Sequence, residues 1–480
     1  MLHQLKQNMQ NKFKLNTNDQ LYLLPLSVED FIADNHLSRL INELVEQFDT
    51  TPIEAAYSYL GQKSYHPKSL IKLWIYGYAT GTFSGRKIAS RCESDTAYMY
   101  LSSMYKPDFR TLNDFRKDNI ESFNKYFVDI VKVCNQFGMV SFGTIAIDGT
   151  KIRANAATHR SKDKEGYQKW LLNINRQIEE LHKKANEINT EEDKTFGNKR
   201  GDELPKQIQK KEHLKSKIEK VLAKIKEDEK INLTDEDAKV MKSKGRHQAH
   251  YNAQGAVSEN GVLLTSYVTT SPSDKEQLEP HLKQMEDNFN CKPQNILADS
   301  GYSSYDNYEL LDKKEIIAYM PDQQFENMEN NLKKPYHRCH FKYDQQNDFY
   351  ICPQGETLTF RYRSESKRFK QQTKVYQATA CKTCTVHAQC TTGDYRTLHQ
   401  ELREPLRQQA RDRLTTAEGK ALYQKRQCTI EPIWGNMKFN RNFKMFSLRG
   451  KKKVNGEFSL LSIAENILKL FNTSFKLQVA

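Results

Sequence analysis

The chain has 480 residues, 37% of them hydrophobic, and carries a formal net charge of +14 at pH 7. This length is more than one hydrophobic core usually organises, so the sequence predicts two or more domains. No run of 18 apolar residues occurs and the polar N-terminal segment lacks the apolar centre of a secretory signal, so we expect a cytoplasmic protein without a membrane partner.

The basic charge favours a polyanionic partner, and nucleic acid is the first candidate. The nine cysteines are an odd number in a chain that we expect inside the cell. Such a set argues against a disulfide framework and favours metal ligation or plain burial.

Apolar residues recur with helical spacing through the first part of the chain, which predicts an all-α N-terminal domain over residues 1–140. The longest of these patterns predicts one helix over residues 111–137. Its apolar stripe would face the core and consists of Leu112, Phe115, Phe123, Phe127, Ile130 and Cys134.

Within this domain, residues 67–103 predict three short helices with tight breaks. Pro67 suits the first turn of a helix that ends before Gly81, while Ser84 and Asp95 can cap the next two helices. This arrangement is typical of a helix-turn-helix unit, although many helix triplets only pack together. If the unit binds DNA, its phosphate contacts would come from Arg86, Lys87 and Arg91.

Two predicted strands each end at an aspartate. Residues 144–147 are rich in β-branched side chains and lead to Asp148, and the apolar residues 296–298 lead to Asp299. Between them lie a predicted hairpin over residues 250–270 and a helix over residues 275–288. The repeated acid at a strand end indicates that the two carboxylates act together.

Two insertions interrupt this pattern. Residues 160–245 are rich in Lys and Glu with apolar residues three and four apart, which predicts either an antiparallel helical hairpin or a dimerising coiled coil. Residues 323–414 contain a Cys-x2-Cys pair and two further cysteines, a spacing typical of a structural zinc site, although buried thiols are the alternative. The candidate zinc ligands are Cys352, Cys381, Cys384 and Cys390, with His387 and Cys339 as substitutes.

Near the C-terminus, Glu431 begins a predicted helix whose first turn contains Pro432. Arg426 precedes this acid and Lys438 follows it by two helical turns, so the three side chains can share one face. A surface ion pair is the simpler explanation of this grouping when the segment is considered alone.

Taken together, four runs resemble the DDE transposases of bacterial insertion sequences: AIDGTKIRANA, YNAQGAV, ILADSGYSS and a Y-x2-R…E-x6-K signature that begins at Tyr423. The gap between the arginine and the glutamate of this signature is one residue longer than its commonest form, and Ser258 stands where relatives tend to carry Asp. The resemblance implies an α/β protein whose ribonuclease-H-like catalytic domain comprises residues 141–322 and 415–480.

By this resemblance, Asp148, Asp299 and Glu431 would form the catalytic triad and hold two Mg²⁺ or Mn²⁺ ions for DNA cleavage and strand transfer. Double-stranded DNA would be the partner, bound by a homodimer or a higher synaptic oligomer associated with the nucleoid. The remaining candidate DNA contacts are Tyr423, Arg426, Lys438, Lys151 and Arg153.

Two alternatives stay open at this point. An inactive, zinc-containing DNA-binding regulator descended from a transposase would keep these motifs without their chemistry. A tyrosine-type recombinase would instead use one nucleophilic tyrosine, and the 24 tyrosines of the chain do not exclude it by number.

Overall fold

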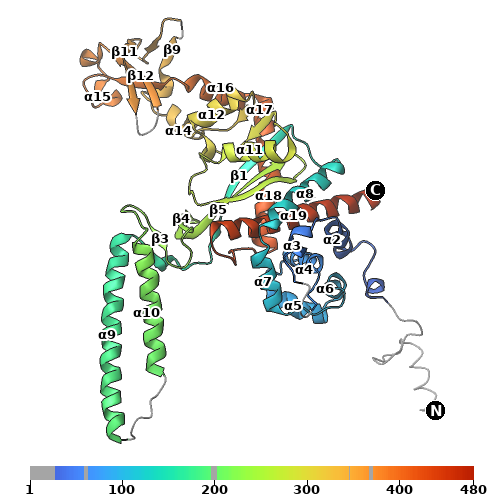
Figure 1. The fold of residues 1–480 in the computed structure, drawn as a ribbon. Helices are drawn as coiled ribbons and strands as arrows, with labels where there is room; N and C mark the ends of the chain where they lie inside the picture. Colours follow the sequence, from blue (N-terminus) through green and yellow to red (C-terminus); the bar gives the residue numbers. More distant parts are fainter. Residues whose placement is uncertain (1–26, 59–62, 196–202, 345, 367–370, 480) are drawn as a thin grey trace, which may run out of the picture. The chain divides into compact units, whose positions relative to one another are not determined.

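The computed structural model describes residues 27–58, 63–195, 203–344, 346–366 and 371–479 (Figure 1). Contacts divide the chain into two units: one comprises Met1–Leu73 and Ser84–Leu112, and the other Trp74–Phe83 and Asn113–Ala480. No helix in the described ranges is long and apolar enough to cross a membrane. The domain limits predicted from the sequence stay predictions.

The first unit is helical. Its described helices are α2 (Leu37–Glu46), α3 (Thr51–Glu54), α5 (Gly85–Ser94) and α6 (Thr96–Leu101), together with the first half of α4 (Pro67–Ala79) and the start of α7 (Phe109–Asp118). The predicted cap of the third short helix is confirmed, because the Asp95 side chain accepts a hydrogen bond from the Ala97 N–H. The predicted cap of the second is wrong, because Ser84 stands at the N-cap position of α5 but its side chain makes no capping hydrogen bond. All three helices predicted within residues 67–103 form, and DNA binding by them stays a prediction.

The single helix predicted over residues 111–137 is wrong, because the chain forms two helices there, α7 and α8 (Ser122–Gln136). The break lies at Ile120, which is buried against α19 (Lys451–Val479). A Cβ on Gly456 of α19 would lie only 2.2 Å from the Ile120 carbonyl oxygen, so the two backbones are in direct contact. The glycine allows this close approach, and the turn at Ile120 lets α8 continue along α19.

The second unit contains a mixed sheet in the order β4-β5-β1-β7-β8, and β6 also pairs with β5. Its strands are β1 (Thr144–Arg153), β4 (Lys239–Ser243), β5 (Arg246–Ser258), β6 (Leu263–Thr269), β7 (Asn295–Leu297) and β8 (Ile317–Tyr319). β5 runs antiparallel to β1 and to β6, and β5 with β6 is the predicted hairpin. β7 runs parallel to both of its neighbours, β1 and β8. The protein is therefore a mixed α/β protein with a helical N-terminal region.

The sequence analysis ended the first strand at Asp148, and the structure corrects this. β1 continues through Arg153 because its antiparallel pairing with β5 extends from Ile145↔Ser258 to Arg153↔His250. Its parallel pairing with β7 stops at Ala146↔Leu297. Asp148 consequently lies inside β1 but beyond the end of β7, where one flank of the strand is open.

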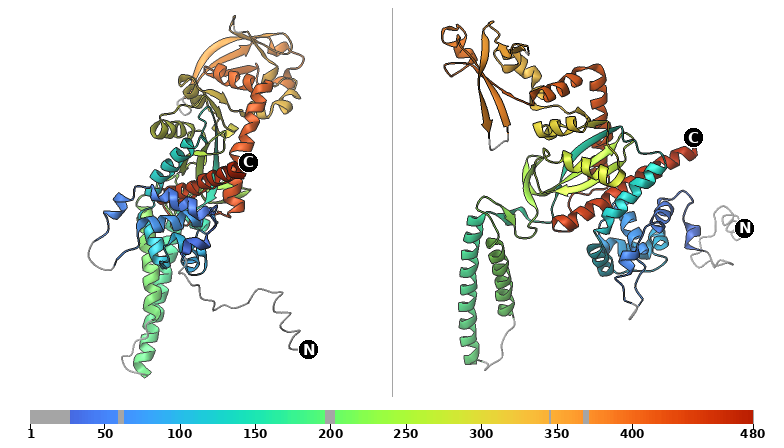
Figure 2. Two further views of the ribbon diagram at one scale, coloured as in Figure 1. Left: turned by 90° about the vertical axis from the view of Figure 1, so that its right-hand side faces the viewer. Right: turned by 45° about the horizontal axis from the view of Figure 1, so that its top comes forward.

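Helices cover both faces of this sheet (Figure 2). On one face, α11 (Leu278–Phe289) places the His281 ring 4.9 Å from the ring of Tyr267 on β6. On the other, the Ser462 hydroxyl of α19 lies 2.7 Å from the Ser266 hydroxyl of β6. The Asn466 side chain of α19 also pairs with both backbone groups of Leu263, which satisfies part of the outer edge of β6.

The first insertion forms two long helices, α9 (Lys164–Thr195) and α10 (Glu203–Leu222), which lie side by side (Figures 1 and 2). Their apolar residues pack on each other in a cluster that includes Tyr167, Ile174, Ile218 and Val221. The hairpin alternative is thus the one observed within this chain. The sequence also predicts a break between the two helices at Gly197, Gly201 and Pro205. Pro205 instead lies in the first turn of α10, and the two glycines lie outside the described residues.

The second insertion contains a five-stranded antiparallel sheet with the order β13-β12-β11-β10-β9. Its strands are β9 (Lys342–Asp344), β10 (Phe349–Ile351), β11 (Thr357–Ser366), β12 (Gln371–Ala378) and β13 (Thr397–Glu401). The remaining elements of this unit are β2 (Ser161–Lys162), β3 (Ile231–Asn232), α12 (Tyr305–Lys313), α13 (Gln323–Glu326), α14 (Met328–Leu332), α15 (His387–Cys390), α16 (Glu404–Thr415), α17 (Ala417–Thr429) and α18 (Glu431–Gly435).

Candidate active site

Asp148 and Asp299 lie at the same edge of two neighbouring strands. The last parallel pair of β1 and β7 is Ala146↔Leu297, and each aspartate follows its member of that pair by two residues. Because side chains alternate along a strand, residues two apart share a face, so both carboxylates begin from corresponding positions. The Asp299 Oδ1 accepts the Gly301 N–H at 3.0 Å, which fixes the turn directly after β7.

The charge of Asp299 acts on Asp148. Burial, followed by the charge of Asp299, raises the pKa of Asp148 from 3.8 to about 6. Burial also raises the pKa of Asp299, while the charge of Arg426 acts in the opposite direction. Two half-buried acids that resist ionisation form an environment that favours a bound cation.

Arg426, on α17, links the third acid to this pair. Its Nη1 lies 3.8 Å from Asp148 Oδ1 and its Nη2 lies 3.6 Å from Glu431 Oε1. The Arg426 side chain is 12% exposed, and its Nε and Nη1 are buried without a hydrogen-bond partner. Glu431 is the first residue of α18 and its side chain is 51% exposed, so it can change rotamer without repacking the core. The guanidinium thus lies between Asp148 and Glu431, and its positive charge partly compensates their negative charges.

Trp434 is a member of the site that the sequence analysis did not single out. Its indole Nε1 donates a hydrogen bond to Asp148 Oδ2 at 3.1 Å, and its ring stacks on Phe458 of α19. Gly255, which pairs with Asp148 across the strands, makes room for the ring, since a Cβ there would lie 2.8 Å from the indole. The sequence signal was the glycine in YNAQGAV, whose purpose becomes visible only with the strand register.

The C-terminal lysine of the predicted signature is directed at β1. Lys438 Nζ donates to the Thr150 hydroxyl and, at 2.9 Å, to the Lys151 carbonyl oxygen. Burial, followed by the charge of Lys244, lowers the pKa of Lys438 to about 8. In this structure Lys438 therefore holds the second half of β1, while the nearby Arg153 is exposed to solvent.

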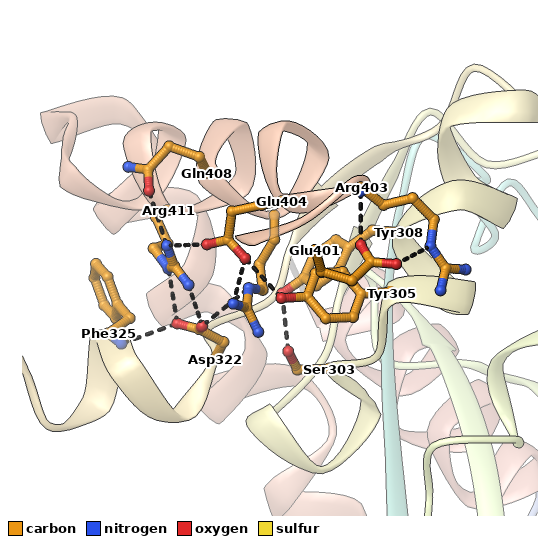
Figure 3. A network of polar contacts seen from close by, with 11 residues as sticks. Ser303, Tyr305, Tyr308, Asp322, Phe325, Glu401, Arg403, Glu404, Gln408 and Arg411 are labelled. Atoms are coloured by element: carbon orange, nitrogen blue, oxygen red, sulfur yellow. Dashed lines mark hydrogen bonds and ion pairs between the residues drawn. The ribbon is translucent and has the colours of Figure 1, made fainter. Parts of the chain in front are cut away.

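A buried network of acids and arginines holds the chain where it returns from the Cys-rich insertion (Figure 3). Arg411 on α16 pairs with Asp322 at 2.5 Å and with Glu404 at 3.0 Å, and Glu404 accepts the Tyr305 hydroxyl at 2.6 Å. Although burial acts to raise it, hydrogen bonds led by that from Arg411 lower the pKa of Asp322 below 3.8. This network fixes α16 against α12, and α17, which follows it, carries Arg426 to the acids.

The other predicted DNA contacts are placed as follows. Tyr423 is half-buried on α17, with the Arg426 guanidinium 6.0 Å from its ring centroid. In the helical unit, Arg86 and Lys87 are exposed on α5, and the Arg86 guanidinium lies 4.7 Å from the Phe109 ring centroid. Arg91 is half-buried, 5.5 Å from the Tyr98 ring centroid, and Lys151 Nζ donates to the Lys242 carbonyl at 3.3 Å.

The four predicted zinc ligands line one pocket beside the five-stranded sheet: Cys352, Cys381, Cys384 and Cys390. The backbone N–H of Gln354 donates to Cys352 Sγ and that of Arg396 to Cys381 Sγ, both at 3.3 Å. Burial raises the pKa of Cys390, and the charges of the other three thiols add to this. Of the substitutes, His387 lines the same pocket, and Cys339 lies on the surface beside His337.

Two segments of the chain match known protein families. The family described as Transposase DDE domain matches residues 351–471, and the one described as Transposase domain (DUF772) matches residues 26–118. The chain belongs to the DDE transposase family. Comparison with curated proteins and with solved structures gives no match. Glu431 lies inside the matched DDE segment, whereas Asp148 and Asp299 lie outside both matches.

A DDE transposase typically uses divalent metal, and the residues of this one suit such an ion. Its donors are carboxylate oxygens, which are the hard ligands that Mg²⁺ and Mn²⁺ prefer. Arg426 Nε and Nη1 have no hydrogen-bond partner, so the acids do not satisfy the guanidinium in this arrangement. As placed here, no three His, Cys, Asp or Glu side chains of the described residues form a metal-binding group. Neither the three acids nor the four cysteines are therefore gathered around one point as they stand, and Glu431, with a 51% exposed side chain, is the acid with most room to rotate.

Proposed function

We propose that this transposase cleaves DNA at the ends of an insertion sequence and transfers the freed strand to target DNA. Asp148, Asp299 and Glu431 would hold two Mg²⁺ or Mn²⁺ ions. The mixed sheet, with antiparallel strands on one side of β1 and parallel strands on the other, is consistent with the ribonuclease-H-like core that this activity implies.

One observation carries the proposal: two half-buried carboxylates follow adjacent parallel strands, and a single guanidinium joins one of them to a third acid. Two divalent ions held by these acids would activate the attacking oxygen and stabilise the leaving oxygen of a phosphodiester. The protein supplies the orientation. The Trp434 N–H holds one oxygen of Asp148, the Gly301 N–H holds one oxygen of Asp299, and Lys438 holds the strand beyond Asp148.

Cationic side chains and one tyrosine would bind the DNA backbone. Phosphate contacts fix the position of the duplex without reading its sequence, and a chain with a net charge of +14 suits that task. We assign the contacts to the exposed or half-buried cations already placed: Arg86, Lys87, Arg91, Lys151 and Arg153, with Tyr423, Arg426 and Lys438 at the acids themselves.

The direct test uses the DNA that flanks the element. The wild-type protein, incubated with these ends and Mg²⁺, is expected to leave free 3′-hydroxyl groups at mapped positions. Asp299→Asn should abolish cleavage while binding to the ends persists, because an amide lacks the charge that the cation needs. Asp287→Asn, a change of the same kind at an exposed site on α11, is the control.

The alternatives give different results in the same assay. A protein–DNA adduct that survives denaturation would indicate tyrosine chemistry, which the membership in the DDE family disfavours. Cleavage that is unchanged in Asp299→Asn, or absent from the wild type with every metal tried, would refute the proposed activity and leave a DNA-binding regulator.

We also propose that the four cysteines of the second insertion hold a structural zinc ion. The pocket that they share and the backbone N–H groups that donate to two of their sulfur atoms support this proposal. Among the described residues of the insertion, the apolar cluster beneath them has six buried members, a small core that a bound ion would help to order. The synaptic oligomer expected of the family stays a proposal, and the exposed Leu172 on the α9–α10 hairpin is one residue such a contact could cover.

A further inference from the structure

A fourth carboxylate, Asp274, lies beneath the proposed metal site. It belongs to the loop between β6 and α11, and its Oδ1 accepts hydrogen bonds from Asn252 Nδ2 and Gln254 Nε2, each at 2.7 Å. These two amides come from residues two apart on β5, so they project from the same face of the sheet. One oxygen of Asp274 thus accepts hydrogen bonds from two side chains of one strand. We call Asp274, Asn252 and Gln254 together the Asp274 clamp.

The Asp274 clamp crosses β1 immediately after the first acid of the site. Gly149 pairs with Gln254 in the strand register. A Cβ on Gly149 would lie 2.3 Å from Gln254 Nε2 and 2.7 Å from Asp274 Oδ1. Only a residue without a side chain fits there, so the clamp rests directly on the backbone that follows Asp148.

The other oxygen of Asp274 reaches the end of β7. Asp274 Oδ2 lies 3.4 Å, and Asp299 Oδ1 2.9 Å, from the position that a Cβ on Gly301 would occupy. The same carboxylate therefore faces the turn that Asp299 caps. Through its two oxygens, Asp274 spans the backbone after β1 and the backbone after β7.

Further buried groups hold the clamp from below. The Tyr302 hydroxyl donates to Gln254 Oε1 at 2.5 Å, which orients the amide so that its nitrogen faces Asp274. His281 Nε2 lies 3.4 Å from the same oxygen. Asn307 Nδ2 donates to the carbonyl oxygens of Lys275 and Tyr302, at 2.7 and 2.6 Å, which ties the Asp274 loop to the turn after β7. The position of the Asp274 carboxylate is therefore defined from three elements.

We propose that Asp274 is a positioning residue that sets the separation of Asp148 and Asp299 by bracing the two strand ends that carry them. This inference rests on the proposed metal-dependent activity. The Asp274 clamp requires a hydrogen-bond acceptor at Oδ1. Asp274 then acts on the two acids through the backbone at Gly149 and Gly301. Mg²⁺ demands near-ideal octahedral geometry, so a small change in the spacing of its ligands weakens binding.

The test measures Mn²⁺ binding directly, by calorimetry and by electron paramagnetic resonance, on the full chain without DNA. Asp274→Ala removes the acceptor and is expected to weaken Mn²⁺ binding by about 10- to 100-fold, the usual effect of losing a group that orients metal ligands. Asp274→Asn keeps an oxygen that can accept both amides and is expected to retain most of the affinity. Asp287→Asn should match the wild type, and Asn252→Ala, which removes one donor, should give an intermediate loss.

The outcomes separate this inference from the proposed function. If the wild type and Asp299→Asn bind Mn²⁺ equally, the metal site itself is refuted. If Asp299→Asn loses binding but Asp274→Ala does not, the positioning role alone is refuted. Equal losses in Asp274→Asn and Asp274→Ala would mean that Asp274 acts through its charge, which also contradicts the brace. Should Asp274→Ala fail to fold, as judged by its melting transition, Asn252→Ala decides between these results.

Discussion

The burial of Asp148 predicts that removing its charge stabilises the metal-free protein. Burial and the charge of Asp299 raise the pKa of Asp148 from 3.8 to about 6. The unfolded chain releases this proton near the ordinary pKa, whereas the folded chain keeps it to about pH 6, so the folded state binds more protons within that window. Stability therefore falls as the pH rises through the window. A difference of about two pKa units lowers the free energy of unfolding by about 3 kcal/mol. The full loss is reached above about pH 6.

Asp148→Asn keeps an oxygen for the Trp434 N–H and removes the buried charge. Near neutral pH and with a chelator present, the variant is expected to be more stable than the wild type by up to about 3 kcal/mol. This advantage should disappear at about pH 3, below the ordinary pKa, where the wild-type carboxyl is largely protonated in both the folded and the unfolded state. Urea unfolding at the two pH values measures the difference, with Asp287→Asn as the exposed control.

Two results would refute this reasoning. One is a variant that is no more stable than the wild type near neutral pH. The other is an advantage of the same size at both pH values, which would arise from packing and not from the charge. Divalent cations should reverse the order, because an ion that binds only the folded wild type raises its melting temperature and leaves Asp148→Asn unchanged.

Three further predictions concern the surroundings of the site. Trp434→Phe keeps the stacking on Phe458 but loses the hydrogen bond to Asp148, so cleavage should fall by about tenfold with little change in melting temperature, measured by strand mapping and calorimetry. Gly255→Ala forces a methyl group against the Trp434 ring and should destabilise the protein by about 1–3 kcal/mol in urea unfolding; an unchanged midpoint contradicts the close contact. Cys381→Ser should lower both the zinc content, measured by elemental analysis, and the protease resistance of the insertion; an unchanged zinc stoichiometry removes the proposed zinc site.

Local patterns were enough to predict several elements of this fold. The short helices after Pro67, the hairpin that turns at Gly261 and the helix that begins at Glu431 all form where composition and capping residues placed them. Each depends on interactions between residues close in sequence, which a single chain records directly. The helix break at Ile120 was missed because its cause, Gly456 of α19, lies more than three hundred residues away.

The candidate site shows the same division. The acids were visible because each follows an apolar run or begins a helix. The residues that orient them were not, since Trp434, Asn252 and Asp274 meet only through strand register and sheet faces. The glycines at positions 149 and 255 were the nearest signal, because each gives space to a side chain from a different element. Sequence could indicate that space was needed, but not which residue fills it.

The account depends most on a metal site formed by Asp148, Asp299 and Glu431. The most direct measurement is a crystal structure of the protein soaked in Mn²⁺, with anomalous scattering used to locate the ions. The account predicts anomalous density between Asp148 and Asp299, with the Glu431 carboxylate turned to the same density and Arg426 displaced from it. Ions bound only elsewhere, with Arg426 still between the acids at saturating Mn²⁺, would contradict it.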